Sequence, residues 1–131
     1  VKRAYPLGPG IYIISATLYE SIDNYTFGPW TVEEESMYES YLRAVLQYQD
    51  ALKKPAKMAA LLKQHPFSYW DNAYSWLEKL RFGRLCAWLR TYKPVPDVNL
   101  DGTMLIWHLS QANIEAALFG SPPEKATAPK R

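Results

Sequence analysis

The segments Gly10-Ile11-Tyr12-Ile13-Ile14-Ser15-Ala16-Thr17-Leu18 and Thr103-Met104-Leu105-Ile106-Trp107-His108-Leu109 decide the fold of this chain. Each is a short and almost wholly apolar run, which is typical of a strand covered on both faces. The stretch between them carries helical signals, so we expect adjacent, parallel strands joined by a right-handed helical crossover. The sequence therefore predicts a small α/β domain, in which four to five helices pack on a two- or three-stranded parallel sheet.

Two helices are predicted in the first half of the intervening stretch. Thr31 and Glu34 form a capping box, in which the side chain of each residue can satisfy a backbone amide of the other. An apolar stripe at helical spacing follows as far as Leu52. Pro55 suits the first turn of a short second helix that runs to about Gln64.

A third helix is predicted to run from a cap at Ser68 or Asp71 towards Tyr92. Its apolar stripes before and after Gly83 are rotated by roughly a quarter turn relative to each other, at about 100° per residue. We therefore expect a kink or break at Phe82-Gly83.

The remainder of the chain is predicted to hold one more helix and a tail. Val95–Gly102 is predicted to be a loop that ends in the turn signal Asp101-Gly102. After the second strand, Ser110 caps a helix that ends at Gly120. We expect residues 1–120 to form a single α/β domain, and residues 121–131, rich in Pro, Ala and Lys, to form a disordered tail.

Composition restricts the classes of partner. The 131 residues carry a formal net charge of +2, whereas nucleic-acid-binding proteins concentrate basic residues on one face, so no nucleic-acid partner is expected. No apolar run approaches the roughly 18–20 residues of a membrane span. The single cysteine excludes an internal disulfide. Because the chain starts at Val1 without a signal segment, we expect it to be part of a longer or processed protein.

Catalytic and metal-binding motifs are hard to find. His65 and His108 are far apart and lack the spacing of a zinc site, so a helix end and a strand face explain them better. Cys86 lies in a Leu- and Trp-rich helix, which favours a buried, unreactive thiol, although Arg84 and Arg90 offer a way of lowering its pKa. We expect no bound metal and no organic cofactor.

Each cluster of charged or aromatic residues can be interpreted in two ways, as a structural feature or as a functional site. Helix capping explains the acidic run Glu33–Glu35 without paired-carboxylate chemistry. A solvated helix face with buried stems explains a group of basic residues better than nucleic-acid binding does; the group is Lys79, Arg81, Arg84, Arg90 and Lys93. Three aromatic residues of one loop form either a platform for a sugar or protein, or a cover over the core: Tyr25, Phe27 and Trp30.

Three segments resemble a known protein family. Gly8–Leu18, the helix Leu80-Arg81-Phe82-Gly83-Arg84-Leu85-Cys86-Ala87-Trp88-Leu89-Arg90 with Pro94 after it, and Thr103–Leu109 resemble the C-terminal soluble part of bacterial polytopic glycosyltransferases. These enzymes are similar to the dolichyl-phosphate-mannose–protein mannosyltransferases. The resemblance implies a domain on the periplasmic side of the inner membrane, attached to a transmembrane portion that performs sugar transfer. It transfers no catalytic residue to this chain.

The first functional hypothesis is therefore a non-catalytic extracytoplasmic accessory domain of a membrane glycosyltransferase-like protein. The alternative is a free-standing, cytoplasmic interaction protein that forms a homodimer through an open sheet edge, where unpaired backbone groups favour strand pairing. A small enzyme is a third class, which no group of residues supports.

Overall fold

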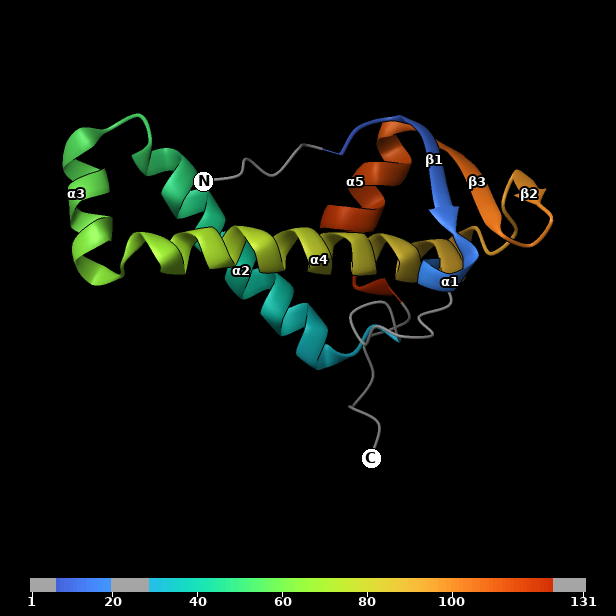
Figure 1. The fold of residues 1–131 in the computed structure, drawn as a ribbon, viewed down its shortest axis with the longest axis horizontal. Coiled ribbons are helices and arrows are strands. Elements are labelled where there is room, and N and C mark those ends of the chain that lie inside the picture. Colours follow the sequence, from blue (N-terminus) through green and yellow to red (C-terminus); the bar gives the residue numbers. More distant parts are fainter. Residues whose placement is uncertain (1–6, 20–28, 124–131) are drawn as a thin grey trace.

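The computed structural model describes residues 7–19 and 29–123, which form five helices and one three-stranded sheet. In chain order the elements are β1 (Gly10–Ser15), α1 (Ala16–Tyr19), α2 (Val32–Ala51), α3 (Pro55–Gln64), α4 (Phe67–Tyr92), β2 (Val98–Leu100), β3 (Met104–Leu109) and α5 (Gln111–Phe119). Figure 1 shows α4 running along the molecule, with α3 near one end of it and the sheet near the other. The mixed α/β class is confirmed in this coarse form.

The sheet has the strand order β1-β3-β2, and both pairings are antiparallel. The two predicted strands are indeed neighbours, with Ile13 opposite Ile106, but the prediction that they run parallel is wrong. The reason is a strand that the sequence analysis assigned to a loop. After the helices the chain enters β2, which runs in the same direction as β1. The hairpin turn after β2 then reverses the chain, so that β3 lies between β1 and β2 and is antiparallel to both.

The turn of this hairpin is built by residues that tolerate a left-handed backbone. Asp101 and Gly102 have φ angles of 51° and 71°, and positive values at consecutive positions suit the mirror-image turns that join antiparallel strands. The Thr103 amide closes the turn by donating to the Leu100 carbonyl at 2.9 Å. The Asn99 side chain accepts a further bond from the Gly102 amide at 2.8 Å.

Helix α4 is one continuous element of 26 residues, so the predicted break at Phe82-Gly83 is wrong. Its two apolar stripes are rotated because they face different partners. The first half packs with α2 and α3 in one core, where Tyr74 and Leu77 lie beside Tyr48. The second half packs against the sheet and α5 in another core, where Leu85 and Leu89 are members. One continuous helix thus contributes to two cores.

Several local signals are confirmed at the helix ends. Thr31 caps α2, with its amide donating to a Glu34 carboxylate oxygen at 3.1 Å. Pro55 occupies the first turn of α3. The Ser110 hydroxyl accepts from the Asn113 amide at 3.1 Å and caps α5. Helix α4, by contrast, begins directly after Pro66 without a side-chain cap, one residue before Ser68.

Gly120 ends α5 as predicted, but for a different reason than a left-handed cap. Its φ of −82° is open to any residue. A Cβ at this position would lie 2.5 Å from the Ala116 carbonyl oxygen, so the close approach of the backbone requires glycine. Of the predicted tail, residues 121–123 are described and Pro123 is fully buried, whereas residues 124–131 lie outside the described ranges.

Candidate functional site

All the helices that cover the sheet lie on one side of it. Ile14, Trp107 and Leu109 point into the core against α4 and α5. The alternate residues of the same strands point away from that core, and Ile11 and Ile13 are 64% and 63% exposed. The prediction that these strands are covered on both faces is therefore wrong.

The uncovered side is called the open face here, and the strand register defines it. Residues directly opposite each other in antiparallel strands share a face. One row across the sheet contains Ile13, Ile106 and Val98, and the next contains Ser15, Met104 and Leu100. A third row pairs Ile11 with His108. The open face thus carries a contiguous group of apolar side chains: Ile11, Ile13, Val98, Leu100, Met104 and Ile106.

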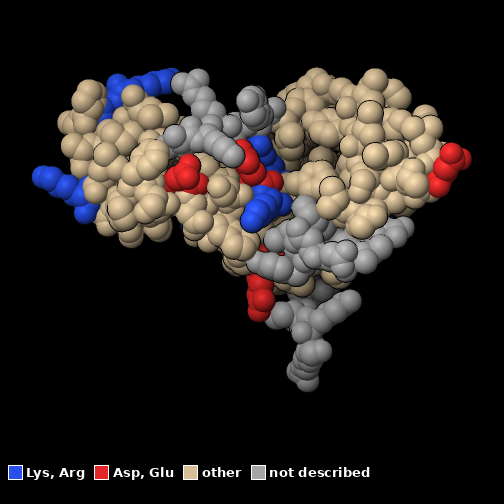
Figure 2. Space-filling model, viewed as in Figure 1, with Lys and Arg blue, Asp and Glu red and all other residues tan. Residues whose placement is uncertain are grey.

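A carboxylate, Asp97, lies beside His108 at one end of the open face. The Asp97 carboxylate accepts from the His108 amide at 2.7 Å and lies 3.3 Å from the His108 ring Nδ1. The hydrogen bond from the His108 backbone amide lowers the pKa of Asp97, and partial desolvation of the carboxylate reduces this lowering. Figure 2 shows few charged side chains on the visible surface of the half that holds the sheet and α5, and more over the other half.

A buried ion pair joins the two halves of the molecule. Arg84 of α4 and Glu35 of α2 are 3% and 8% exposed, with Nη2 and Oε1 2.8 Å apart. Arg84 Nε donates to the same carboxylate at 2.8 Å. Nη1 donates to the carbonyl of Ala117 at 2.7 Å, and Nη2 also donates to the carbonyl of Gly120 at 2.9 Å. Arg84 thereby fastens α2, α4 and the end of α5 together.

Aromatic residues enclose this ion pair. The Tyr38 ring centroid lies 5.2 Å from the Arg84 guanidinium carbon, and its hydroxyl donates to the Leu118 carbonyl at 3.0 Å. The Trp30 indole donates to Glu35 at 3.4 Å. Both charges are saturated by protein partners, which identifies the group as a structural network. The interpretation of Arg84 as part of a solvated face was therefore wrong.

The structure places only part of the predicted aromatic platform. Trp30 is 1% exposed and packs edge-on against Tyr38, so it covers the core and does not present a binding surface. Tyr25 and Phe27 lie outside the described residues.

Both histidines have local aromatic or acidic neighbours. His65 stacks on Tyr69 with ring centroids 3.9 Å apart, and His108 contacts Asp97. Within residues 7–19 and 29–123, no three His, Cys, Asp or Glu side chains gather as metal ligands would. The same residues include no helix that is both long and apolar enough to span a membrane.

Cys86 is fully buried in the core beneath the sheet, as predicted. Burial raises the pKa of its thiol to about 12, and the nearby positive charge of Arg90 only partly offsets this. A protonated thiol is a poor nucleophile. We therefore expect Cys86 to be unreactive towards thiol reagents in the native protein.

This raised pKa has a consequence for stability in alkali. The unfolded chain releases the thiol proton near its ordinary pKa of about 8.5, whereas the folded chain retains it to higher pH. The contribution of the thiol to the free energy of unfolding is therefore fully present below the pKa of the unfolded chain. It is lost progressively as the pH rises towards 12. Between about pH 9 and 11, wild type should lose up to about 1.4 kcal/mol per pH unit more than Cys86→Ala. Guanidinium titrations at several pH values measure this; parallel pH profiles for the two proteins would contradict it.

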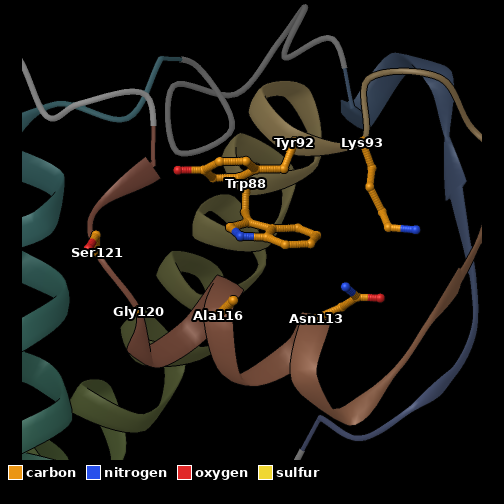
Figure 3. A pocket seen from close by; sticks show the side chains of 7 residues that line it. All are labelled: Trp88, Tyr92, Lys93, Asn113, Ala116, Gly120 and Ser121. Carbon is orange, nitrogen blue, oxygen red and sulfur yellow. The ribbon is translucent and has the colours of Figure 1, made fainter.

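A cavity of about 400 Å³ opens between the last turns of α4 and the helix α5. Figure 3 shows the rings of Trp88 and Tyr92 on one side of it, with Ala116 and Gly120 across from them. Lys93 and Asn113 lie together at one end, and Ser121 lies at the other. None of these lining residues belongs to the open face.

Comparisons of the chain with protein-family models, with curated proteins and with solved structures found no match.

Two features of the structure have sequence signals that were not used in the predictions: the β2–β3 hairpin and the buried ion pair. The alternation Val98-Asn99-Leu100 before Asp101-Gly102 is a hairpin pattern. Glu35 and Arg84 each lie at helical spacing from apolar residues, Tyr38 and Leu80, so both charges interrupt an apolar stripe. Opposite charges on two such stripes indicate a buried pair.

Proposed function

We propose that this chain is a non-catalytic, extracytoplasmic accessory domain of a membrane glycosyltransferase-like protein, and that the open face docks it against the rest of that protein. The single observation that carries the proposal is the exposed apolar group on the open face. Contiguous apolar surface of this kind is rare on monomeric proteins and typical of interaction sites. Its partner would be an uncharged, apolar surface, such as membrane-proximal loops of the same polypeptide.

The packing of the three family-like segments supports this proposal. Gly8–Leu18 contains β1, Thr103–Leu109 contains β3, and these strands pair along their length. The third segment, Leu80–Arg90, supplies the part of α4 that packs beneath them through Leu85, Cys86, Trp88 and Leu89. Segments that are far apart in the sequence thus build one structural unit, as a shared domain requires.

The buried titratable groups Glu35, Arg84 and Cys86 have structural explanations, which favours the non-catalytic interpretation. The Glu35–Arg84 pair is enclosed by protein partners, and the Cys86 thiol is buried within a core. Catalytic acids, bases and nucleophiles need contact with a substrate, which such burial denies to these groups.

A second candidate function is self-association through β1. Strand β3 pairs with one edge of β1, and no strand of the described residues pairs with the other, outer edge. Two copies joined edge to edge about a two-fold axis would extend the sheet and bring their open faces together. Sedimentation of the 131-residue chain at tens of micromolar tests this function: a concentration-dependent dimer supports it and a monomer excludes it.

The docking proposal is tested by photo-crosslinking in the product of the whole gene, expressed in its native membrane. A photoreactive amino acid replaces Ile13 in one variant and Lys63, on α3, in the control. We expect Ile13 to crosslink to another part of the same polypeptide outside these 131 residues, and Lys63 not to do so. A gene that encodes no membrane-spanning segments, or equal crosslinking from both positions, would overturn the proposal.

A further inference from the structure

The cavity between α4 and α5 combines an aromatic wall with a polar end. The Trp88 and Tyr92 rings have centroids 5.5 Å apart and are inclined by 41°, so they form an angled wall. Trp88 is anchored in the core, whereas Tyr92 is 59% exposed. An aromatic face carries partial negative charge and attracts the polarised C–H bonds of a sugar ring.

The polar groups at the end of the cavity are held in place by the fold. The Asn113 Oδ1 accepts from the Ser110 amide at 3.0 Å, which fixes the side chain and leaves its NH₂ group as the remaining donor. Figure 3 shows the amide nitrogen of Asn113 on the side nearer to Trp88. The Lys93 carbonyl accepts from the Trp107 indole at 2.9 Å, so the backbone that carries the Lys93 side chain is also fixed.

The charge at this end favours an anion. The lining residues include Lys93 and no acidic residue. Asp97 is close enough for Lys93 to lower its pKa slightly, but its carboxylate is bonded to His108, and among the described residues no carboxylate forms an ion pair with Lys93. An ammonium group and an amide donor together match a carboxylate or phosphate oxygen.

We propose that this cavity binds a single pyranose ring that carries an anionic group. The apolar face of the ring lies on the exposed ring of Tyr92 and against the edge of Trp88, which is only 7% exposed. The anion contacts Lys93 and Asn113, and ring hydroxyls reach Ser121. The volume of about 400 Å³ falls in the usual range of small-molecule sites, roughly 300–1,000 Å³. Carboxylate and phosphate share the chemistry that Lys93 recognises, and the probes below separate them.

The test follows the indole N–H resonance of Trp88 by NMR during titration with glucuronate, glucose 6-phosphate and glucose. We expect millimolar binding of at least one anionic sugar, and about tenfold weaker binding of glucose because it lacks the charged contact. The better of the two anionic probes identifies the anion. Trp76, in the other half of α4, is the internal reference and should not shift.

Two variants and one control assign the binding to this cavity. Lys93→Gln should weaken the anionic sugar about tenfold and leave glucose unchanged, and Tyr92→Ala should weaken both. The control is Lys79→Gln, which removes the same charge from above the ring of Trp76, 5.1 Å away, and should change neither affinity. No shift of Trp88 with either anionic sugar, equal affinity for glucose, or full binding by Lys93→Gln would overturn the proposal.

This inference does not depend on the docking function. The cavity and the open face share no residue. A failure of Ile13 to crosslink would therefore leave the sugar-binding proposal standing. A failure of the sugar titration would likewise leave the docking proposal standing.

Discussion

Arg84→Met is expected to lower the free energy of unfolding by about 3–5 kcal/mol, because it leaves the Glu35 carboxylate buried without its partner. The substitution also removes the donors to the carbonyls of Ala117 and Gly120, which releases the end of α5. Chemical denaturation followed by circular dichroism measures the change. Lys57→Met is the matched control: it breaks an ion pair of similar length, 2.9 Å to Asp50, that is exposed to water, and should cost much less than Arg84→Met.

The double variant Glu35→Gln/Arg84→Met identifies the cause of that loss. The glutamine substitution removes the stranded charge and keeps an acceptor near the Trp30 indole, so the double variant should be more stable than Arg84→Met alone. Strictly additive losses from the two substitutions would show that the pair does not interact in the way that its geometry indicates.

Ile14→Ala is expected to cost about 2–5 kcal/mol, whereas Ile13→Ala, one residue earlier in β1, should cost less than about 1 kcal/mol. The two residues share a strand and a side-chain type, but Ile14 is 3% exposed and Ile13 is on the open face. The difference measures directly whether the sheet is covered on one side. Denaturation of both variants of the 131-residue chain is the experiment, and equal losses would mean that both faces are packed.

Much of the helical part of the fold was predictable, because its signals are local. Caps at Thr31 and Ser110 and the proline at Pro55 act within one turn, and the structure keeps each of them. The strand direction was not predictable from the two long apolar segments alone. It depends on the short strand β2, whose three residues are all exposed and therefore lack an apolar core pattern.

The break predicted in α4 is absent, and Trp30 covers the core, both for reasons of tertiary structure. A rotated stripe on α4 is compatible with an interrupted helix and equally with a continuous helix between two cores, and only the packing partners decide between these. Trp30 is likewise drawn into the core by an acceptor, Glu35, on the helix that follows it. Neither the packing partners of α4 nor the hydrogen bond from Trp30 to Glu35 produces a periodic pattern in the sequence.

The cavity illustrates the same limit for the candidate sites. Trp88 and Tyr92 lie one helical turn apart on α4, but their proximity to Asn113 arises only when α5 packs beside α4. The open face was concealed by its composition, since isoleucines in a strand suggest burial. Their register opposite β3 shows that the exposed rows are as apolar as the buried ones.

The oxidation of Met104 by hydrogen peroxide tests the docking role of the open face most directly. Met104 lies in the open face and is 42% exposed, and Met58 on α3 is the internal reference. We predict fast oxidation of Met104 in the isolated 131-residue chain and strong protection in the whole gene product that is proposed above to lie in a membrane, with Met58 oxidised equally in both. Equal oxidation of Met104 in the two preparations would contradict the claim that the open face is a docking surface.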